Sequence, residues 1–232
     1  GCAFCATGQA GFVRNLTPGE MVDQVRLVGE DFERRVTNAV AMGQGEPFAN
    51  YDATLAALRI MNSADGLGIG ARHLTVSTCG ILAGISRFAE EPEQFTLAVS
   101  LHSAIQSTRD RLMPGVTGMP LDALRLALVD YTVRTRRRVT LEYALIDGEN
   151  DSDDESAALV RFCSGLLCHV NLIPANPVVG QPFDRSPQSA VERFATLLSG
   201  SGTEATVRAE RGADIDAACG QLRQRDLGVP PG

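Results

Sequence analysis

The chain has 232 residues, of which 44% are hydrophobic and 21% charged, so it is long enough to bury the core of one large α/β domain. Six cysteines at irregular spacings argue against a secreted disulfide framework and favour the reducing cytoplasm. A net charge of −7 excludes a broadly basic surface for nucleic acid, and no apolar run is long enough to span a membrane.

Apolar runs typical of strands alternate with amphipathic runs typical of helices along the chain. A first helix is expected to begin at Thr17-Pro18, where a threonine N-cap is followed by proline at the first helical position. We predict strands at 36–42, 74–78, 95–100, 139–146, 170–173 and 205–208. We predict further helices at 52–61, 81–89, 121–131, 155–163 and 190–198.

This serial β-α-β-α order predicts a parallel sheet with helical crossovers. Six strands in one series indicate a barrel or a partial barrel, and because no linker or repeat interrupts them we treat residues 1–232 as one domain. Functional residues of such barrels lie at the carboxyl ends of the strands. Polar or glycine-rich sequences follow four of the predicted strands, so a site is expected at that edge.

The candidate ligand-binding residues are those that follow these strands: Gly45, Glu46, Ser77, Ser100, Leu101, His102 and Asn176. Gly43-x-Gly45-Glu46 lacks the third glycine of a dinucleotide loop, but its carbonyls and carboxylate suit an ammonium group such as that of methionine. The serines and the asparagine suit a ribose, a carboxylate or an adenine edge, although each alone is more typical of a turn. His102 fits a ligand donor, a general base or a packed side chain equally well.

The cysteines fall into three groups. Cys2-x-x-Cys5 alone fits a redox dithiol, half of a zinc site or two ligands of an iron–sulfur cluster. Cys219 lies in a run of glycine and acidic residues, which predicts an accessible thiol suited to covalent chemistry on a substrate. Cys79, Cys163 and Cys168 are expected to pack as small hydrophobic side chains.

Several of these motifs together resemble one family. Residues 1–12 read GCAFCATGQAGF, and the segments MGQGEP at 42–47, STCG at 77–80, SLH at 100–102, NLIP at 171–174 and DIDAACGQL at 214–222 follow in order. Over nearly the whole chain, these segments are similar to the RlmN/Cfr family of radical S-adenosylmethionine RNA methyltransferases, and their details favour the RlmN branch. The resemblance implies a partial (β/α)6-type barrel that lacks its first strand.

The resemblance also implies roles for the candidate residues. Cys2 and Cys5 would bind a [4Fe-4S] cluster, and Gly45, Glu46, Ser77, Ser100, Leu101, His102 and Asn176 would hold S-adenosylmethionine. Cys219 would carry a methyl group to C2 of an adenine in 23S rRNA and in tRNA, next to the anticodon, with electrons from a donor such as flavodoxin or ferredoxin.

The sequence departs from the family pattern at its start. The family motif is Cys-x-x-x-Cys-x-x-Cys, and only its last two cysteines match, as Cys2 and Cys5. The family's upstream product-releasing cysteine, its acidic general base and its N-terminal RNA-binding domain have no counterpart here. We expect the chain alone to be inactive, because a cluster held by two native thiolates should be labile. Three alternatives remain: a Cfr-like enzyme acting on C8, a non-catalytic fragment that binds S-adenosylmethionine or RNA, and a zinc or redox protein. The oligomeric state stays open.

Overall fold

A computed structural model describes residues 1–9, 11–176 and 182–208. In these residues six parallel strands form one sheet in chain order, from β1 to β6. Because all the strands run in the same direction, each connection must cross back from the carboxyl end of one strand to the amino end of the next. The strands are β1 (Ala39–Ala41), β2 (Leu74–Thr78), β3 (Thr96–Ser100), β4 (Val139–Leu145), β5 (Cys168–Pro174) and β6 (Glu204–Val207).

The helices of the described residues precede the first strand or connect successive strands. Short 3₁₀ turns lie at Pro47–Asn50, Ala71–His73 and Pro114–Val116. The helices are α1 (Ala6–Gln9), α2 (Pro18–Asp31), α3 (Tyr51–Asn62), α4 (Leu82–Phe88), α5 (Gln106–Leu112), α6 (Leu121–Thr135), α7 (Asp153–Cys163) and α8 (Gln188–Gly200).

Local capping chemistry explains where two of these helices begin. Thr17 accepts a hydrogen bond from the Glu20 backbone, while the Glu20 carboxylate accepts one from the Thr17 backbone, which completes a capping box. Ser152 caps α7 by accepting a hydrogen bond from the Glu155 backbone, and acidic residues fill the first turn of α7, where the helix dipole favours negative charge. The predicted start of α2 is confirmed.

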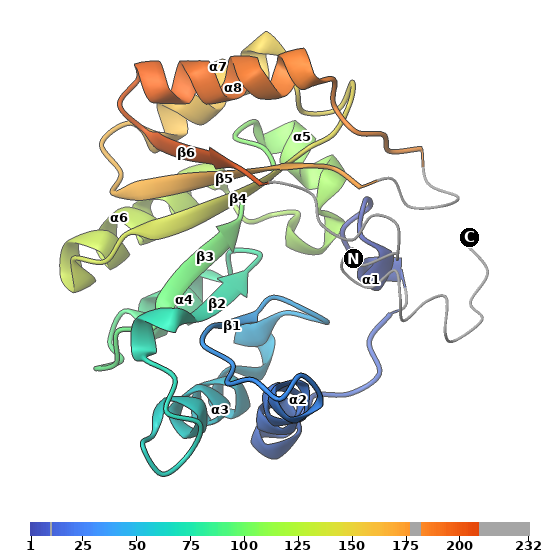
Figure 1. Ribbon diagram of the computed structural model, residues 1–232. Helices are drawn as coiled ribbons and strands as arrows, with labels where there is room; N and C mark the ends of the chain where they lie inside the picture. The colour runs from blue at the N-terminus through green and yellow to red at the C-terminus, as the bar shows by residue number, and fades with distance from the viewer. Residues whose placement is uncertain (10, 177–181, 209–232) are drawn as a thin grey trace.

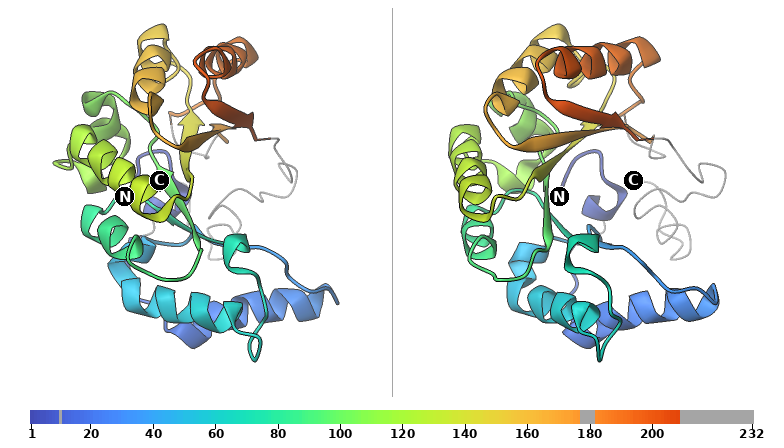
Figure 2. Two further views of the ribbon diagram at one scale, coloured as in Figure 1. Left: turned by 90° about the vertical axis from the view of Figure 1, so that its left-hand side faces the viewer. Right: turned by 60° about the vertical axis from the view of Figure 1, so that its left-hand side comes forward.

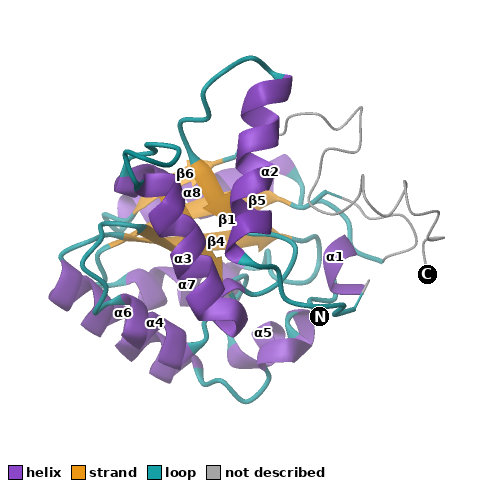
Figure 3. Ribbon diagram, turned by 90° about the horizontal axis from the view of Figure 1, so that it is seen from below, coloured by secondary structure: helices purple, strands orange, loops and turns teal. Residues whose placement is uncertain are grey.

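The sheet is curved and open rather than closed. Helices α3 to α8 cover its outer face, while the N-terminal segment with α1 lies inside the curve (Figures 1 and 2). Seen from below, α2 and α3 lie in front of the strands and α1 lies apart from the other helices (Figure 3). The predicted α/β partial barrel is therefore confirmed. That a first strand is lacking concerns chain outside this sequence and stays a prediction.

The two faces of the sheet differ in chemistry because successive side chains of a strand point to opposite sides. Leu141, Tyr143 and Leu145 of β4 are fully buried in the main core, as are Val170 and Leu172 of β5. The alternate positions carry polar groups that stand side by side across the sheet. They form one row, because the strand register pairs Ser100 with Glu142, Glu142 with Asn171 and Asn171 with Thr206.

Two sequence predictions of secondary structure need correction. The strand predicted at 36–42 is only three residues long, because its partner β2 begins opposite Ala39 and earlier residues have nothing to pair with. Helix α5 was not predicted, since the residue before it, Ile105, has no side chain that caps a helix, and its seven residues are mostly polar. None of the described helices is long and apolar enough to cross a membrane.

Candidate active site at the carboxyl end of the sheet

The Cys2–Cys5 loop is held against the carboxyl end of the sheet. The backbone N–H of Ala3 donates to the carbonyl of Leu112 at the end of α5, at 2.9 Å. The N–H of Cys5 donates to the carbonyl of Cys2 at 3.2 Å, which folds the loop into a turn. Cys2 and Phe4 pack on a small apolar cluster formed by Leu112, Met113, Val116, Ile146 and Ala175. The loop therefore presents two half-buried thiols at the edge where the sequence predicted the ligand site.

Glu46 links the ends of the first two strands. Its Oε1 accepts from the N–H of Phe48 at 2.9 Å, which caps the turn that follows β1, and its Oε2 accepts from the N–H of Cys79 at 2.7 Å. Burial, followed by the charge of Glu46, raises the pKa of Cys79. The neighbouring Gly45 has a φ of +146°, a backbone conformation that side chains other than glycine rarely adopt. Two backbone donors thus fix a carboxylate in place while leaving it lone pairs for a ligand cation.

His102 is buried and held in a strained conformation. Its φ is +56°, its Nδ1 accepts from the N–H of Ala144 at 3.0 Å, and the ring of Phe4 meets its ring edge-on at 4.9 Å. Burial lowers the pKa of His102 to about 3, with the nearby Arg109 cation adding to the shift, so the imidazole is neutral at pH 7. The bond to Nδ1 places the remaining proton on Nε2. His102 is therefore a hydrogen-bond donor rather than a cation.

Asn150 holds the turn around His102 in place. Its Nδ2 donates to the carbonyls of His102 and Ala144, both at 2.6 Å, and its Oδ1 accepts from the N–H of Ile146 at 2.8 Å. The side chain is fully buried, and Tyr143 donates to its carbonyl. Because an interior amide with all its bonds made is rigid, Asn150 fixes the positions of both β3 and β4 ends.

Arg109 of α5 is the least expected group at this edge. Its side chain is 1% exposed, yet among the described residues only Nη2 has a partner, the carbonyl of Cys79 at 2.6 Å. Nε and Nη1 are buried with no hydrogen-bond partner in the described parts of the chain. Burial lowers the pKa of Arg109, and its charge in turn acts on Cys2 and Cys79. A buried cation with two free donors fits a bound anion.

Another unsatisfied atom lies at the end of β5. Asn176 Oδ1 is buried and has no hydrogen-bond partner among the described residues. Ser77 is buried, Ser100 half-buried and Leu101 fully buried on neighbouring strands. The structure therefore brings all the predicted ligand-binding residues to one edge of the sheet. Cys219 lies outside the described residues.

These groups fit the predicted cofactors. The two thiols offer sulfur ligands to iron, and the two free donors of Arg109 suit a negatively charged group beside them. Burial raises the pKa of Cys2, and the Cys5 thiolate adds to this shift, but a bound metal ion deprotonates a coordinating thiol. In the described residues no three His, Cys, Asp or Glu side chains gather as a metal site, so the two cysteines are only part of a ligand set.

Three residues at this edge were missed by the sequence analysis. Arg109 gave no signal, because arginine is rarely buried. Asn150 lies in a polar turn after a predicted strand, and Glu142 is a charged residue inside an otherwise mostly apolar strand. Each position therefore gave only a weak indication of a functional role. Glu142 is 6% exposed, and its Oε2 accepts from Asn171 Nδ2 at 2.8 Å. Burial raises the pKa of Glu142 despite that bond.

Comparison with known proteins defines the class. The family model of the radical SAM superfamily matches residues 1–160, so the chain belongs to this superfamily. Its members use a [4Fe-4S] cluster and S-adenosylmethionine, which confirms the two predicted cofactors at the level of the family.

The more similar relatives confirm the predicted resemblance to the RlmN branch. The chain is 44% identical over 97% of its length to the "Probable dual-specificity RNA methyltransferase RlmN" of Alkaliphilus metalliredigens, and 47% identical over 97% to that of Symbiobacterium thermophilum. It spans 64% and 62% of their respective lengths. A radical SAM methyltransferase from Sphaerobacter thermophilus is 50% identical, with a TM-score of 0.91 over 96% of this chain and 66% of that one.

A more distant likeness shows the fold alone. The S-adenosylmethionine-bound SuiB of Streptococcus suis is 14% identical, with a TM-score of 0.62 over 94% of this chain and 46% of that one. A likeness at this level shows that the two chains share the arrangement of sheet and crossovers, and it says nothing about the substrate.

Proposed function

We propose that residues 1–232 form the catalytic domain of a radical S-adenosylmethionine methyltransferase that methylates C2 of an adenine in 23S rRNA and in tRNA. The observation that carries the proposal is the identity of 44% and 47% across 97% of the chain with relatives named as dual-specificity RNA methyltransferases. The gathering of the candidate residues at one edge of the sheet supports it.

When bound, the two cofactors supply a methyl group and a radical able to abstract hydrogen. The chain's own residues position them. Cys2 and Cys5 bind iron, and Glu46 with Gly45 accepts the ammonium group of S-adenosylmethionine. The hydroxyls of Ser77 and Ser100, the backbone at Leu101, the Nε2–H of His102 and the free Oδ1 of Asn176 contact the rest of that molecule. Arg109 neutralises anionic groups at the floor of the site.

Cys219 is proposed to carry the methyl group. C2 of adenine is not nucleophilic, so a polar transfer from a sulfonium cannot reach it, whereas a methyl group held on a thiol can be delivered after hydrogen is removed from it. The buried face around Phe4, Leu112 and Ile146 keeps water from this chemistry. The acidic chain needs further basic surface for RNA, and an electron donor such as flavodoxin or ferredoxin is required.

The chain as given is proposed to be inactive by itself, because it offers two of the three thiolates in the family motif. The test is anaerobic reconstitution with iron and sulfide, followed by electron paramagnetic resonance of the reduced protein with and without S-adenosylmethionine. The chain is compared with one extended upstream to restore the third cysteine. A four-iron signal that shifts with S-adenosylmethionine only in the extended protein supports the proposal. Absence of a cluster in both overturns it and favours a zinc or redox protein.

The reaction is tested separately on the extended, reconstituted protein with RNA. Methylated adenine is mapped by nuclease digestion and mass spectrometry, and C2 and C8 products are told apart by comparison with standards. A C8 product assigns the chain to a Cfr-like activity, and binding without turnover assigns it to a non-catalytic role. Methylation that persists in Cys219→Ala would show that Cys219 does not carry the methyl group.

A further inference from the structure

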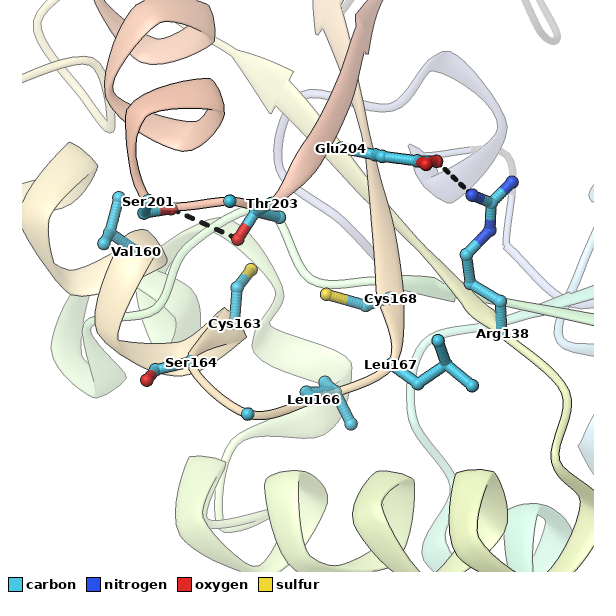
Figure 4. Close-up of a pocket in the computed structure, with 12 residues that line it drawn as sticks. Arg138, Val160, Cys163, Ser164, Leu166, Leu167, Cys168, Ser201, Thr203 and Glu204 are labelled. Carbon is cyan, nitrogen blue, oxygen red and sulfur yellow. Dashed lines mark hydrogen bonds and ion pairs between the residues drawn. The ribbon is translucent and has the colours of Figure 1, made fainter.

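A cavity lies at the amino end of the sheet, opposite the candidate site. Its volume is about 330 Å³, and it is formed where β4, β5 and β6 begin and where α7 ends (Figure 4). Arg138, Ser201, Thr203 and Glu204 contribute polar groups to its wall, and Cys163 and Cys168 contribute two thiols.

The two thiols face each other across this cavity. Figure 4 shows the sulfur of Cys163, at the end of α7, and the sulfur of Cys168, at the start of β5, pointing toward one another. Cys163 is 2% exposed and Cys168 is 8% exposed, and both are free. The sequence predicted that they pack as small hydrophobic side chains. Both do belong to the main core, but their sulfur atoms also line a space that a small molecule can enter.

The backbone between the cysteines brings the sulfurs together. The N–H of Leu166 donates to the carbonyl of Cys163 at 3.0 Å, and Gly165 has a φ of +70°, so the chain reverses within four residues. Arg125 holds the outside of this turn through the carbonyls of Phe162 and Ser164. These contacts hold the turn that carries both cysteines in one conformation.

The electrostatics of the pair are unequal. The Cys163 thiol donates a hydrogen bond to the Cys168 sulfur, which lowers the pKa of Cys168 and raises that of Cys163. Burial opposes this lowering of the Cys168 pKa, and the neighbouring Arg138 cation adds to it. Since the thiolate is the form that attacks electrophiles, Cys168 is the nucleophile of the pair and Cys163 is the resolving thiol, which attacks the oxidised Cys168.

We propose that Cys163 and Cys168 form a peroxide-reactive dithiol that closes to a reversible disulfide. The Cys168 thiolate attacks one oxygen of hydrogen peroxide, giving a sulfenic acid and hydroxide as the O–O bond breaks. The Cys163 sulfur then displaces the sulfenic oxygen, which leaves as water. Two thiols lose two electrons in total, and one peroxide is reduced to two waters. The cavity admits the peroxide and the disulfide ties the end of α7 to the start of β5.

The test uses the 232-residue chain and a convenient cleavage pattern. Trypsin cuts after Arg161 and Arg185, so both cysteines fall in one peptide that contains no other cysteine. The reduced chain is treated anaerobically with about one equivalent of hydrogen peroxide, free thiols are alkylated, and the digest is weighed by mass spectrometry. The expected peptide carries no alkyl group and is lighter by two hydrogens, and dithiothreitol restores double alkylation. A peptide that stays doubly alkylated, or that gains oxygen without forming the disulfide, overturns the proposal.

Two matched variants test the order of events. In Cys163→Ser the reaction stops at the sulfenic acid of Cys168, which dimedone labels. In Cys168→Ser we expect dimedone to label Cys163 about tenfold more slowly, because its thiol is the more protonated one. Equal labelling of the two variants would refute the assigned roles. The disulfide readout on the unsubstituted chain does not depend on either variant folding, nor on the proposed methyltransferase activity.

Discussion

The carboxyl end and the amino end of this sheet are built from the same six strands, but their polar side chains differ in how fully they are paired. At the carboxyl end, Arg109 and Asn176 keep buried atoms without partners among the described residues, and His102 is held in a strained conformation. At the amino end, Arg138 is paired with Glu204 at the surface, and the turns close on themselves. The difference teaches where a ligand can complete the structure: the unpartnered atoms of Arg109 and Asn176 lie at the predicted ligand site, where a bound molecule can supply their missing hydrogen bonds.

The largest expected effect is at Asn150. Asn150→Ala removes three hydrogen bonds inside a fully buried turn and should lower the free energy of unfolding by about 3–5 kcal/mol. The matched control is Asn62→Ala, which loses a single bond from Nδ2 to the carbonyl of Ile69, near the amino end, at a cost of about 1 kcal/mol. Urea denaturation followed by circular dichroism measures both. Equal losses in the free energy of unfolding would contradict the view that side-chain hydrogen bonds stabilise the carboxyl end more than the amino end.

The next effect has the opposite sign. Arg109→Met removes a buried cation with two free donors, so the cofactor-free chain should gain about 1–3 kcal/mol of stability. The same change should reduce iron bound after reconstitution, because the anionic groups lose their neutralising charge. Thermal denaturation and iron analysis give the two readouts. Arg111→Met, on the same helix but with an exposed ion pair to Glu149, should change neither by much. Loss of stability in Arg109→Met would show that the arginine is satisfied.

Glu142 provides a test of the polar row on the inner face. Its pKa is raised by burial above the ordinary value of 4.5, so the unfolded chain ionises first as pH rises. Between that value and the raised pKa the unfolded state releases a proton that the folded state keeps, and stability is lost. Glu142→Gln keeps an acceptor for Asn171 and removes the titration. The variant should therefore gain stability relative to the parent chain as pH rises from about 4 to 7, measured by urea denaturation at each pH. A constant difference would contradict the raised pKa.

The smallest expected effect is at the amino end. Glu204 is 72% exposed and pairs with Arg138 at the cavity wall. Glu204→Gln should change the free energy of unfolding by no more than about 0.5 kcal/mol, and added salt should erase the difference, because exposed ion pairs are screened. Denaturation at low and high salt measures this. A large, salt-independent loss would mean that this end is as tightly constrained as the other.

The sequence by itself determined the features that depend on neighbours along the chain. The capping residue Thr17 and the alternation of strands with helices are local signals, and they predicted the start of α2, the order of elements and the parallel sheet. The rule that parallel strands share one carboxyl edge was enough to bring Glu46, Ser77, His102 and Asn176 together. Their roles toward ligands remain predictions.

Only the tertiary structure decided the features that depend on residues far apart in the chain. The burial of Arg109 follows from where α5 packs, which no local pattern revealed. The row that joins Ser100, Glu142 and Asn171 exists because the register of three strands aligns them. Cys163 and Cys168 face each other because a helix end and a strand start meet at one turn. The physical reason is the same in each case: side-chain environment is set by packing between elements, whereas sequence periodicity records only which face of its own element a residue occupies.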